Sequence, residues 1–200
     1  MDCRHVRLPN ACDIISGNMA VQIPFQIVAD ICRKTGGRVI LIGGQALGVR
    51  GYQRMTLDLD FMLTEKDYAK MKPALEGAGY REMARTQIAA KMRADAAEAM
   101  DIDFLFVAPE TFHAVESEAG EENFAGNRFR VPKTEHLIAL KLHAAREQPQ
   151  ARELRDLADI IELIKANGIN AKSADFKSLS LKFGTAELYD KILRAVKAHE

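Results

Sequence analysis

The stretch "LIGGQALGVRGYQRMTLDLDFML", Leu41–Leu63, carries the two features that decide the fold. Paired glycines, Gly43 and Gly44, follow an apolar run, and Asp58 and Asp60 stand near its end with one leucine between them. Aspartate is disfavoured in strands, and burying a carboxylate without a partner is costly. Two aspartates inside an apolar segment therefore indicate a role other than packing.

A strand over residues 56–63 accounts for this alternation. Side chains at positions i and i+2 of a strand share a face, so Asp58 and Asp60 project together. Two adjacent carboxylates repel one another, and a divalent cation between them relieves that repulsion. Mg²⁺ prefers oxygen ligands and is commonly held by one or two carboxylates together with substrate phosphates. The neighbouring apolar side chains are expected to enter the core from the other face: Leu57, Leu59 and Phe61.

The segment "MDIDFLFV", residues 100–107, repeats the pattern. Asp101 and Asp103 share one face of this expected strand, opposite Ile102, Phe104 and Phe106. If the two acidic strands pair, three or four carboxylates converge. That is the layout of a two-metal site, in which the ions activate an attacking oxygen and clamp a phosphoryl group.

The paired glycines follow an expected strand at residues 38–42 and open a turn into a short helix. Glycine lets the backbone approach a ligand closely and leaves N–H groups directed outward, and such groups at a helix start bind phosphate. Gln45 is expected to add a polar contact. Arg54 and Thr56 precede the acidic strand, where they can bond phosphate or orient the loop.

The remaining segments predict an α/β (α+β) fold, with a small mixed sheet and flanking helices in a core over 1–130 and a helical region over 131–200. The pattern predicts helices at 24–35, with Pro24 at the first position, and at 65–78, with Thr64 as the cap and Asp67 as its partner. Residues 1–20 read as irregular, 81–94 as strand or helix, 109–115 as a helical turn and 120–128 as a loop. Further helices are expected at 132–147, 153–168 and 185–198, and four methionines are expected to fill the core: Met55, Met62, Met71 and Met100.

Composition narrows the functional class. The 200 residues are 48% hydrophobic and 28% charged, with a formal net charge of zero, which is typical of a soluble globular protein without an overall field to recruit nucleic acid or a membrane. The odd number of cysteines, three, disfavours a disulfide framework. No apolar run reaches the ~18 residues of a membrane span. We expect a soluble, cytoplasmic protein without a membrane partner, whose lack of net charge permits a homo-oligomer.

Together the motifs of residues 38–165 resemble the DNA polymerase β-like nucleotidyltransferase superfamily. Its signature is a hydrophobic strand, Gly-Gly or Gly-Ser, a gap of about a dozen residues and Asp-x-Asp. "MDIDFLFV" resembles the strand that carries the third carboxylate of that superfamily. "HLIALKLHAAREQPQARELRDLADIIEL", residues 136–163, resembles a helical element in the branch of the AbiEii-type nucleotidyltransferase toxins and their relatives.

The resemblance implies roles for individual residues. Asp58, Asp60 and Asp103 match the catalytic, metal-binding carboxylates, with Asp101 as the competing third choice. Gly43 and Gly44 match the turn that holds the triphosphate, and Lys141 matches a helical lysine near the nucleotide phosphates. For the charged helix there are two readings, a place near the nucleotide or ion pairs that dock the helical region on the sheet; its residues are Arg155, Asp156 and Asp159.

The implied activity is nucleotidyl transfer from an NTP to a hydroxyl acceptor, with two Mg²⁺ ions. The acceptor is RNA, a protein or a small molecule, and the branch also implies a toxin with an antitoxin partner. For an RNA end, six basic residues offer a local patch: Arg50, Arg54, Arg81, Arg85, Lys91 and Arg93. The alternatives are a catalytically inactive binding or regulatory protein of the same fold, and a structural domain whose acidic strands face solvent.

Overall fold

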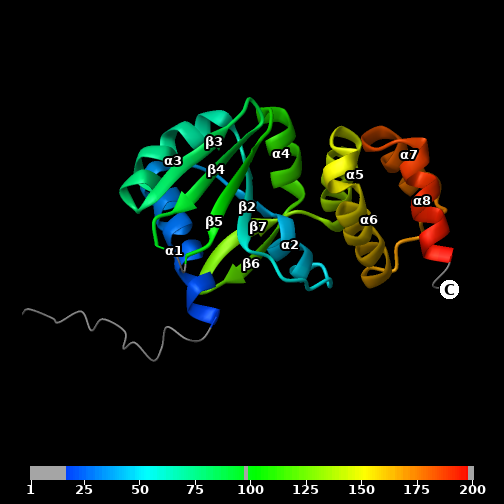
Figure 1. The fold of residues 1–200 in the computed structure, drawn as a ribbon, viewed down its shortest axis with the longest axis horizontal. Helices are drawn as coiled ribbons and strands as arrows, with labels where there is room; N and C mark the ends of the chain where they lie inside the picture. The colour runs from blue at the N-terminus through cyan, green and yellow to red at the C-terminus, as the bar shows by residue number, and fades with distance from the viewer. Residues whose placement is uncertain (1–16, 97–98, 198–200) are drawn as a thin grey trace, which may run out of the picture.

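A computed structural model describes residues 17–96 and 99–197 of the chain. Within those residues the chain forms one seven-stranded mixed sheet and eight helices (Figure 1). The predicted α/β class with a mixed sheet is confirmed. The sheet strands end at Val131, and helices alone follow from Thr134. The division into parts 1–130 and 131–200 stays a prediction.

The sheet has the strand order β3-β4-β5-β2-β1-β7-β6. Its centre is the parallel pair of β2 and β5, and β2 also pairs antiparallel with β1. The two acidic segments of the sequence are therefore neighbouring strands. The strands are β1 Ile40–Ile42, β2 Asp58–Leu63, β3 Tyr80–Arg85, β4 Ala89–Ala94, β5 Asp101–Phe106, β6 Gly120–Phe124 and β7 Asn127–Val131.

The helices fall into two groups in space (Figure 1). The first group surrounds the sheet, with α1 and α3 behind it, and the second forms a bundle to one side. The Thr64 cap of α3 is confirmed, because its hydroxyl accepts from the Asp67 N–H. The first group is α1 Gly17–Thr35, α2 Gly43–Val49, α3 Glu65–Gly77 and α4 Pro109–Glu118; the second is α5 Thr134–Glu147, α6 Pro149–Ala166, α7 Ala174–Phe183 and α8 Ala186–Lys197.

The alternation of the acidic strands sorts their side chains as expected. Leu59 and Phe61 of β2 and Ile102 and Phe104 of β5 are buried in the core, while the aspartates between them face the other side of the sheet. The rings of Phe61 and Phe104 lie 6.2 Å apart, stacked across the parallel pair. Burying each such side chain contributes about 1.5–3 kcal/mol, so the apolar face holds the carboxylates in place.

The strand β2 begins at Asp58, two residues later than predicted, and this overturns two expectations for the core. Leu57 is 81% exposed and Met55 is 87% exposed, because both lie in the loop before the strand. The other three predicted core methionines are buried: Met62, Met71 and Met100.

The prediction of a loop over 120–128 was wrong, since β6 and β7 form a hairpin there. Ala125 and Gly126 both adopt positive φ, and the Asn123 side chain accepts from the Gly126 N–H, which is the chemistry of a tight two-residue turn. The strand β6 lies at the edge of the sheet, and its polar sequence gives no alternation that would have predicted it. The open question over 81–94 resolves as the β3–β4 hairpin.

Helix boundaries also differ from the expected ones. The first helix begins at Gly17, so residues 17–20 are helical and Pro24 lies inside the helix; the expected irregular stretch 1–16 lies outside the described residues. Helix α4 extends to Glu118, and α7 was not expected. None of the helices in the described ranges is both long and apolar enough to cross a bilayer.

An ion-pair network joins α5, α6 and the loop before β2. The Lys141 ammonium lies 2.8 Å from an oxygen of Asp156 and 2.7 Å from an oxygen of Asp159. Arg54 donates to Asp159 from that loop, with its Nε at 3.0 Å. The two aspartates are almost completely buried, so each needs its cations, and the network fixes α6 against both α5 and the sheet.

We predict that Asp156→Ala lowers the free energy of unfolding by about 3 kcal/mol, because it leaves part of a buried positive charge unpaired. The matched control is Glu162→Ala on the same helix, which removes an exposed pair with Lys165 and costs about 0.5 kcal/mol or less. Urea unfolding of both variants gives the comparison. Equal losses would show that the network does not hold the bundle.

Candidate active site

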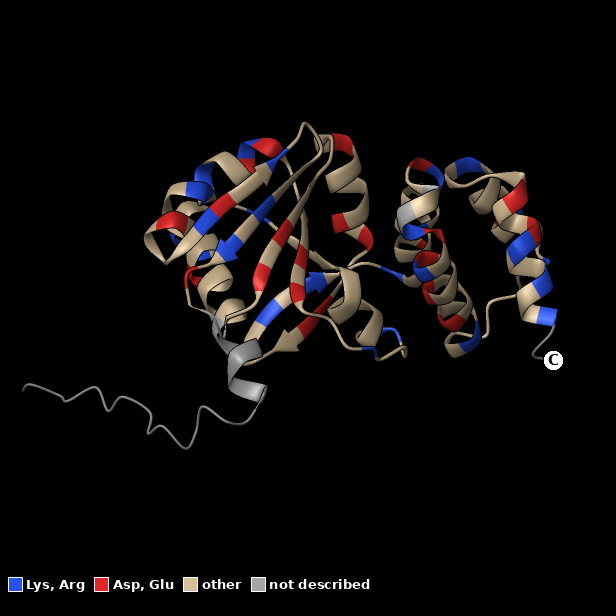
Figure 2. Ribbon diagram, in the orientation of Figure 1, with Lys and Arg blue, Asp and Glu red and all other residues tan. Residues whose placement is uncertain are grey.

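Strand pairing brings the acidic side chains together. In the parallel register of β2 and β5, Asp58 lies beside Asp101 and Asp60 beside Asp103. Neighbouring strands are about 4.8 Å apart, so the carboxylates of each pair are adjacent. Figure 2 shows the acidic segments side by side on β2 and β5, with basic segments on neighbouring β4.

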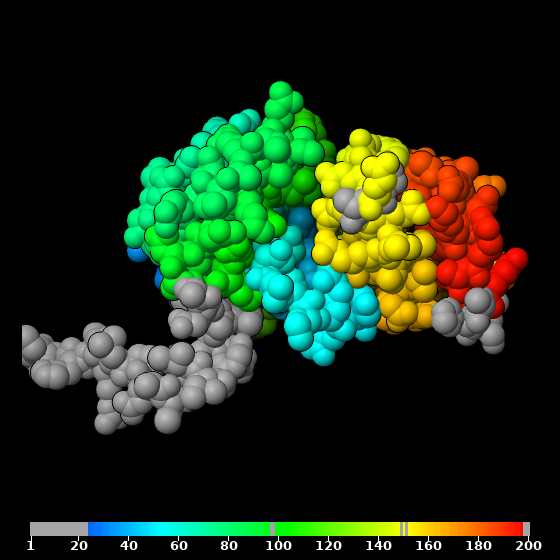
Figure 3. All heavy atoms as spheres, in the orientation of Figure 1, coloured from blue at the N-terminus to red at the C-terminus, as the bar shows by residue number. Residues whose placement is uncertain are grey.

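These carboxylates open onto a cleft of about 540 Å³ between the sheet and the helical bundle. Figure 3 shows the hollow between the sheet and helix α5. Asp58, Asp60 and Asp103 line it from the sheet. The facing wall comes from α5 and α6 and includes three cationic residues: Lys141, Arg152 and Arg155.

The surroundings in the cleft disfavour the ionised forms of Asp60 and Asp103. The pKa of Asp60 is raised to about 6, first by removal from water and then by the negative charges of Asp58 and Asp103, while Lys141 and Arg152 oppose the rise. Removal from water also raises the pKa of Asp103, against the opposing effect of Lys91. Carboxylates whose ionised forms are disfavoured in this way are characteristic of functional sites.

The two candidates for the third carboxylate have different surroundings. Asp103 lines the cleft, and its Oδ1 is buried without a hydrogen-bond partner. Asp101 is outside the cleft lining, and its Oδ1 accepts from the Ala94 N–H at 3.2 Å. This arrangement favours Asp103.

The glycine turn rests directly on the acidic strand. Gly43 has φ +65°, and a Cβ there would lie 1.8 Å from Oδ2 of Asp60, so no other residue fits. A Cβ on Gly44 would lie 2.8 Å from the Cβ of Thr56. The Thr56 hydroxyl in turn donates to Oδ1 of Asp58 at 2.9 Å. The turn, the threonine and the two aspartates therefore form one packed unit.

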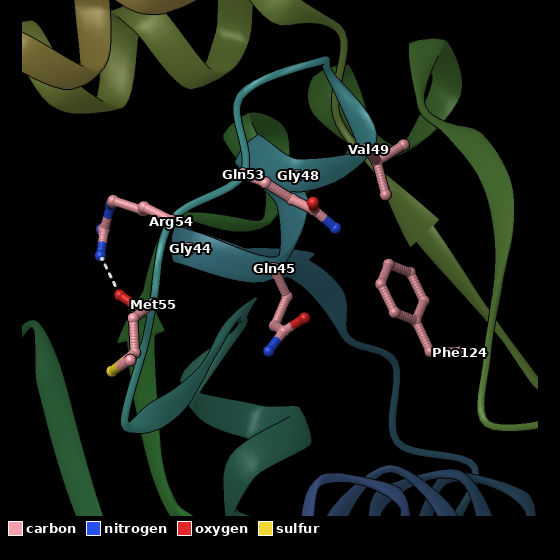
Figure 4. A pocket seen from close by; sticks show the side chains of 8 residues that line it. All are labelled: Gly44, Gln45, Gly48, Val49, Gln53, Arg54, Met55 and Phe124. Carbon is pink, nitrogen blue, oxygen red and sulfur yellow. Dashed lines mark hydrogen bonds between the residues drawn. The ribbon is translucent and has the colours of Figure 1, made fainter. Parts of the chain in front are cut away.

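The other predicted nucleotide-binding residues have different surroundings. Arg54 and Lys141 line the cleft, but both are bound to the aspartates of α6. Gln45 lies outside the cleft lining. It lines a neighbouring pocket together with Gln53 and Phe124, as Figure 4 shows, and that pocket shares only Arg54 and Met55 with the cleft.

Three basic residues of the cleft were not predicted as catalytic or nucleotide-binding: Arg85, Lys91 and Arg152. The sequence indicates Arg85 and Lys91 only as part of a local basic patch and indicates no role for Arg152. The cross-strand register places Lys91 opposite Asp103, and no local pattern reveals that pairing. Of the six residues in the predicted basic patch, three line the cleft: Arg54, Arg85 and Lys91.

The donor set fits a divalent cation in its chemistry. Asp58 and Asp60 present carboxylate oxygens on one face of a strand, which suits a hard ion such as Mg²⁺. Within residues 17–96 and 99–197, no group of three or more Asp, Glu, His or Cys side chains is placed to hold a metal ion. The pair on β2 is therefore the part of the site that fits best.

Several solved structures with the same fold are nucleotidyltransferases or resemble them. The solution structure of the antibiotic-resistance factor ANT(2'')-Ia is 17% identical, covers 93% of this chain and 100% of its own, and has a TM-score of 0.62. A nucleotidyltransferase-like protein from Paracoccidioides brasiliensis is 15% identical, with coverages of 90% and 93% and a TM-score of 0.53. The lincosamide antibiotic adenylyltransferase LnuA is 15% identical, with coverages of 72% and 96% and a TM-score of 0.51.

No curated protein sequence matches the chain significantly. One family model, described as nucleotidyl transferase AbiEii toxin, type IV toxin–antitoxin system, matches residues 27–198. That range includes the glycine turn, both acidic strands and the whole helical bundle. The chain therefore belongs to the AbiEii family of nucleotidyl transferase toxins, and its fold is that of the polymerase β-like nucleotidyltransferases.

Proposed function

We propose that this protein transfers a nucleoside monophosphate from an NTP to a hydroxyl acceptor in a Mg²⁺-dependent reaction within the cleft. The observation that carries the proposal is the register that sets Asp60 beside Asp103, under the Gly43 turn. The family and the fold support the transferase class. The arrangement of the cleft supports these residues as its centre.

The donor would lie between the glycine turn and the helical wall. Gly43 lines the cleft, and its backbone would approach one side of the phosphates, which Arg152 and Arg155 would face from α6. Gly44 lines the neighbouring pocket. Arg155 is exposed and has no ion pair in the described part of the chain, so its charge is free to meet an anion. Lys141, held by its two aspartates, contributes mainly by fixing the position of α6.

Asp58 and Asp60 would hold Mg²⁺, which neutralises phosphate charge and polarises the α-phosphoryl group. The acceptor oxygen attacks the α-phosphorus, and the bond from that phosphorus to the bridging oxygen breaks, so that pyrophosphate leaves with the electron pair. The acceptor proton passes to Asp103, because the raised pKa of this carboxyl makes it a better base than an ordinary aspartate. Positioning and charge neutralisation supply most of the rate.

The acceptor in this proposal is RNA, a protein or a small molecule. The family places the chain in a toxin–antitoxin context, which supports a toxin with an antitoxin partner. A cytoplasmic location, a homo-oligomer and the expected pair of magnesium ions stay predictions. The alternative function is a binding or regulatory protein that keeps the fold without turnover.

We predict that one NTP with MgCl₂ raises the melting temperature of the protein, and that Asp58→Asn abolishes this shift. A ligand at a hundredfold excess over its dissociation constant stabilises the folded state by about 2.7 kcal/mol. Differential scanning fluorimetry with each of the four NTPs makes the measurement. Asp95→Asn, an exposed change outside the cleft, should retain the shift. A shift that persists in Asp58→Asn would place the nucleotide elsewhere.

A second prediction separates the two candidate bases. Asp103→Asn should lower nucleotidyl transfer at least ~100-fold, because general-base catalysis supplies roughly 10²–10⁴-fold, whereas Asp101→Asn should retain most of it. The assay follows label from [α-³²P]NTP into the RNA, protein and small-molecule fractions of a bacterial extract. The opposite ranking would assign the role to Asp101. Nucleotide binding without transfer in the wild type would favour the inactive alternative.

A third prediction concerns pH. Because the folded-state pKa of Asp60 is raised to about 6, the folded chain retains a proton there that the unfolded chain releases near pH 4, so stability falls as pH rises between these values. In EDTA, Asp60→Asn should therefore be more stable than the wild type at pH 7.5, by on the order of 1–3 kcal/mol, with a smaller gain at pH 4.5.

Urea unfolding at the two pH values measures this difference. Mg²⁺ should reduce the advantage of Asp60→Asn, because the ion stabilises only the wild-type carboxylate pair. A lower stability of Asp60→Asn at pH 7.5 in EDTA would refute the prediction. A gain that Mg²⁺ leaves unchanged would favour acidic strands that merely face solvent.

A further inference from the structure

Three charged residues form one row across the sheet. Lys91 on β4 is the antiparallel partner of Asp103 on β5, and Asp103 is the parallel partner of Asp60 on β2. Side chains directly opposite on neighbouring strands share a face with their Cβ atoms about 5 Å apart. All three residues line the cleft. The row reads cation, carboxylate, carboxylate.

The ammonium group of Lys91 lies close to the third carboxylate. Its Nζ is 3.4 Å from Oδ1 of Asp103 and 4.0 Å from Oδ2 of Asp101. That Asp103 oxygen is buried and has no hydrogen-bond partner, so the nearby Lys91 ammonium compensates its negative charge. Lys91, whose side chain is 39% exposed, is therefore a counter-charge that the sheet places beside Asp103.

The charged side chains of the sheet leave two carboxylates in the cleft without a cationic partner on the sheet. Lys91 balances Asp103, and Arg93, whose Nε is 3.8 Å from Oδ2 of Asp101, balances that residue. The strand β2 then leaves two negative charges, Asp58 and Asp60, which one divalent cation neutralises. On the helical wall, Lys141 and Arg152 are paired with the aspartates of α6, as is Arg54 of the loop before β2. The remaining wall cation, Arg155, is assigned above to the phosphates of the donor.

We propose that Lys91 takes the place of the second metal ion, so that the site binds a single divalent cation on Asp58 and Asp60. This inference rests on the proposed function and departs from the two-ion expectation of the sequence. A fixed ammonium beside Asp103 neutralises the charge that a second ion would otherwise meet, and it repels an ion that approaches that carboxylate. Lys91 is thus a positioning residue, which acts through Asp103.

The experiment counts bound Mn²⁺, by electron paramagnetic resonance of the free ion, in the presence of a saturating NTP whose α,β-bridging oxygen is replaced by CH₂. The wild type should bind one Mn²⁺ per chain. Lys91→Met, which keeps the length of the side chain and removes its charge, should bind two. Lys91→Arg restores the charge and should bind one. Arg93→Met, on the same face of the same strand, should also bind one.

A second variant shows where the additional ion binds. Adding Asp103→Asn to Lys91→Met should return the count from two to one, and circular dichroism checks that each variant is folded. Two ions in the wild type, or one in Lys91→Met, would overturn the role of Lys91 and leave the proposed function standing. No bound ion in either chain would overturn both.

Discussion

The repulsion between the carboxylates of β2 and β5 is the constraint on which the rest of the site depends. Parallel pairing sets Asp60 beside Asp103 while the opposite face of both strands is locked into the core, so the carboxylates cannot move apart by shifting register. Removal from water first, and this repulsion second, raise the pKa values of Asp60 and Asp103. Carboxylates with perturbed pKa values of this kind are typical of functional sites, where a bound ligand compensates their charge.

The surroundings of the acidic pair relieve this cost only in part. Lys91 offsets Asp103 on one side, while the Gly43 turn packs against Asp60 so closely that a side chain cannot intervene. The remaining charge is left to a ligand. Polar groups already fixed before binding need little reorganisation during the reaction, which is how preorganised sites gain their rate.

The helical bundle contributes to the cleft through its own ion pairs. Asp156 and Asp159 bind Lys141, and Asp159 also binds Arg54 from the loop before β2. The sequence left open whether the charged helix serves docking or the nucleotide. The contacts show docking for Asp156 and Asp159. The same helix presents two arginines to the cleft, Arg152, which is paired with Asp156, and Arg155, which has no ion pair among the described residues.

The sequence predicted the parts of the site that local alternation encodes. The aspartates of β2 and β5 were placed correctly on one face because a period of two, set between fully apolar residues, has one reading. The position of Lys91 beside Asp103 was missed because it depends on which strand pairs with β5 from the other side, and residues 81–94 gave no clear period. The β6–β7 hairpin was missed because its strands carry little apolar sequence.

Met55 and Leu57 were wrongly predicted to pack in the core, and their true positions show how the cleft differs from it. Both side chains were assigned to the core, yet both are exposed and line the cleft. They lie on a loop, whereas the carboxylates lie on paired strands. Strands fix the reacting groups, and loops vary among proteins of one fold. The fold that this chain shares with ANT(2'')-Ia and LnuA therefore fixes the paired strands, while the loop residues 54–57 border the cleft beside them.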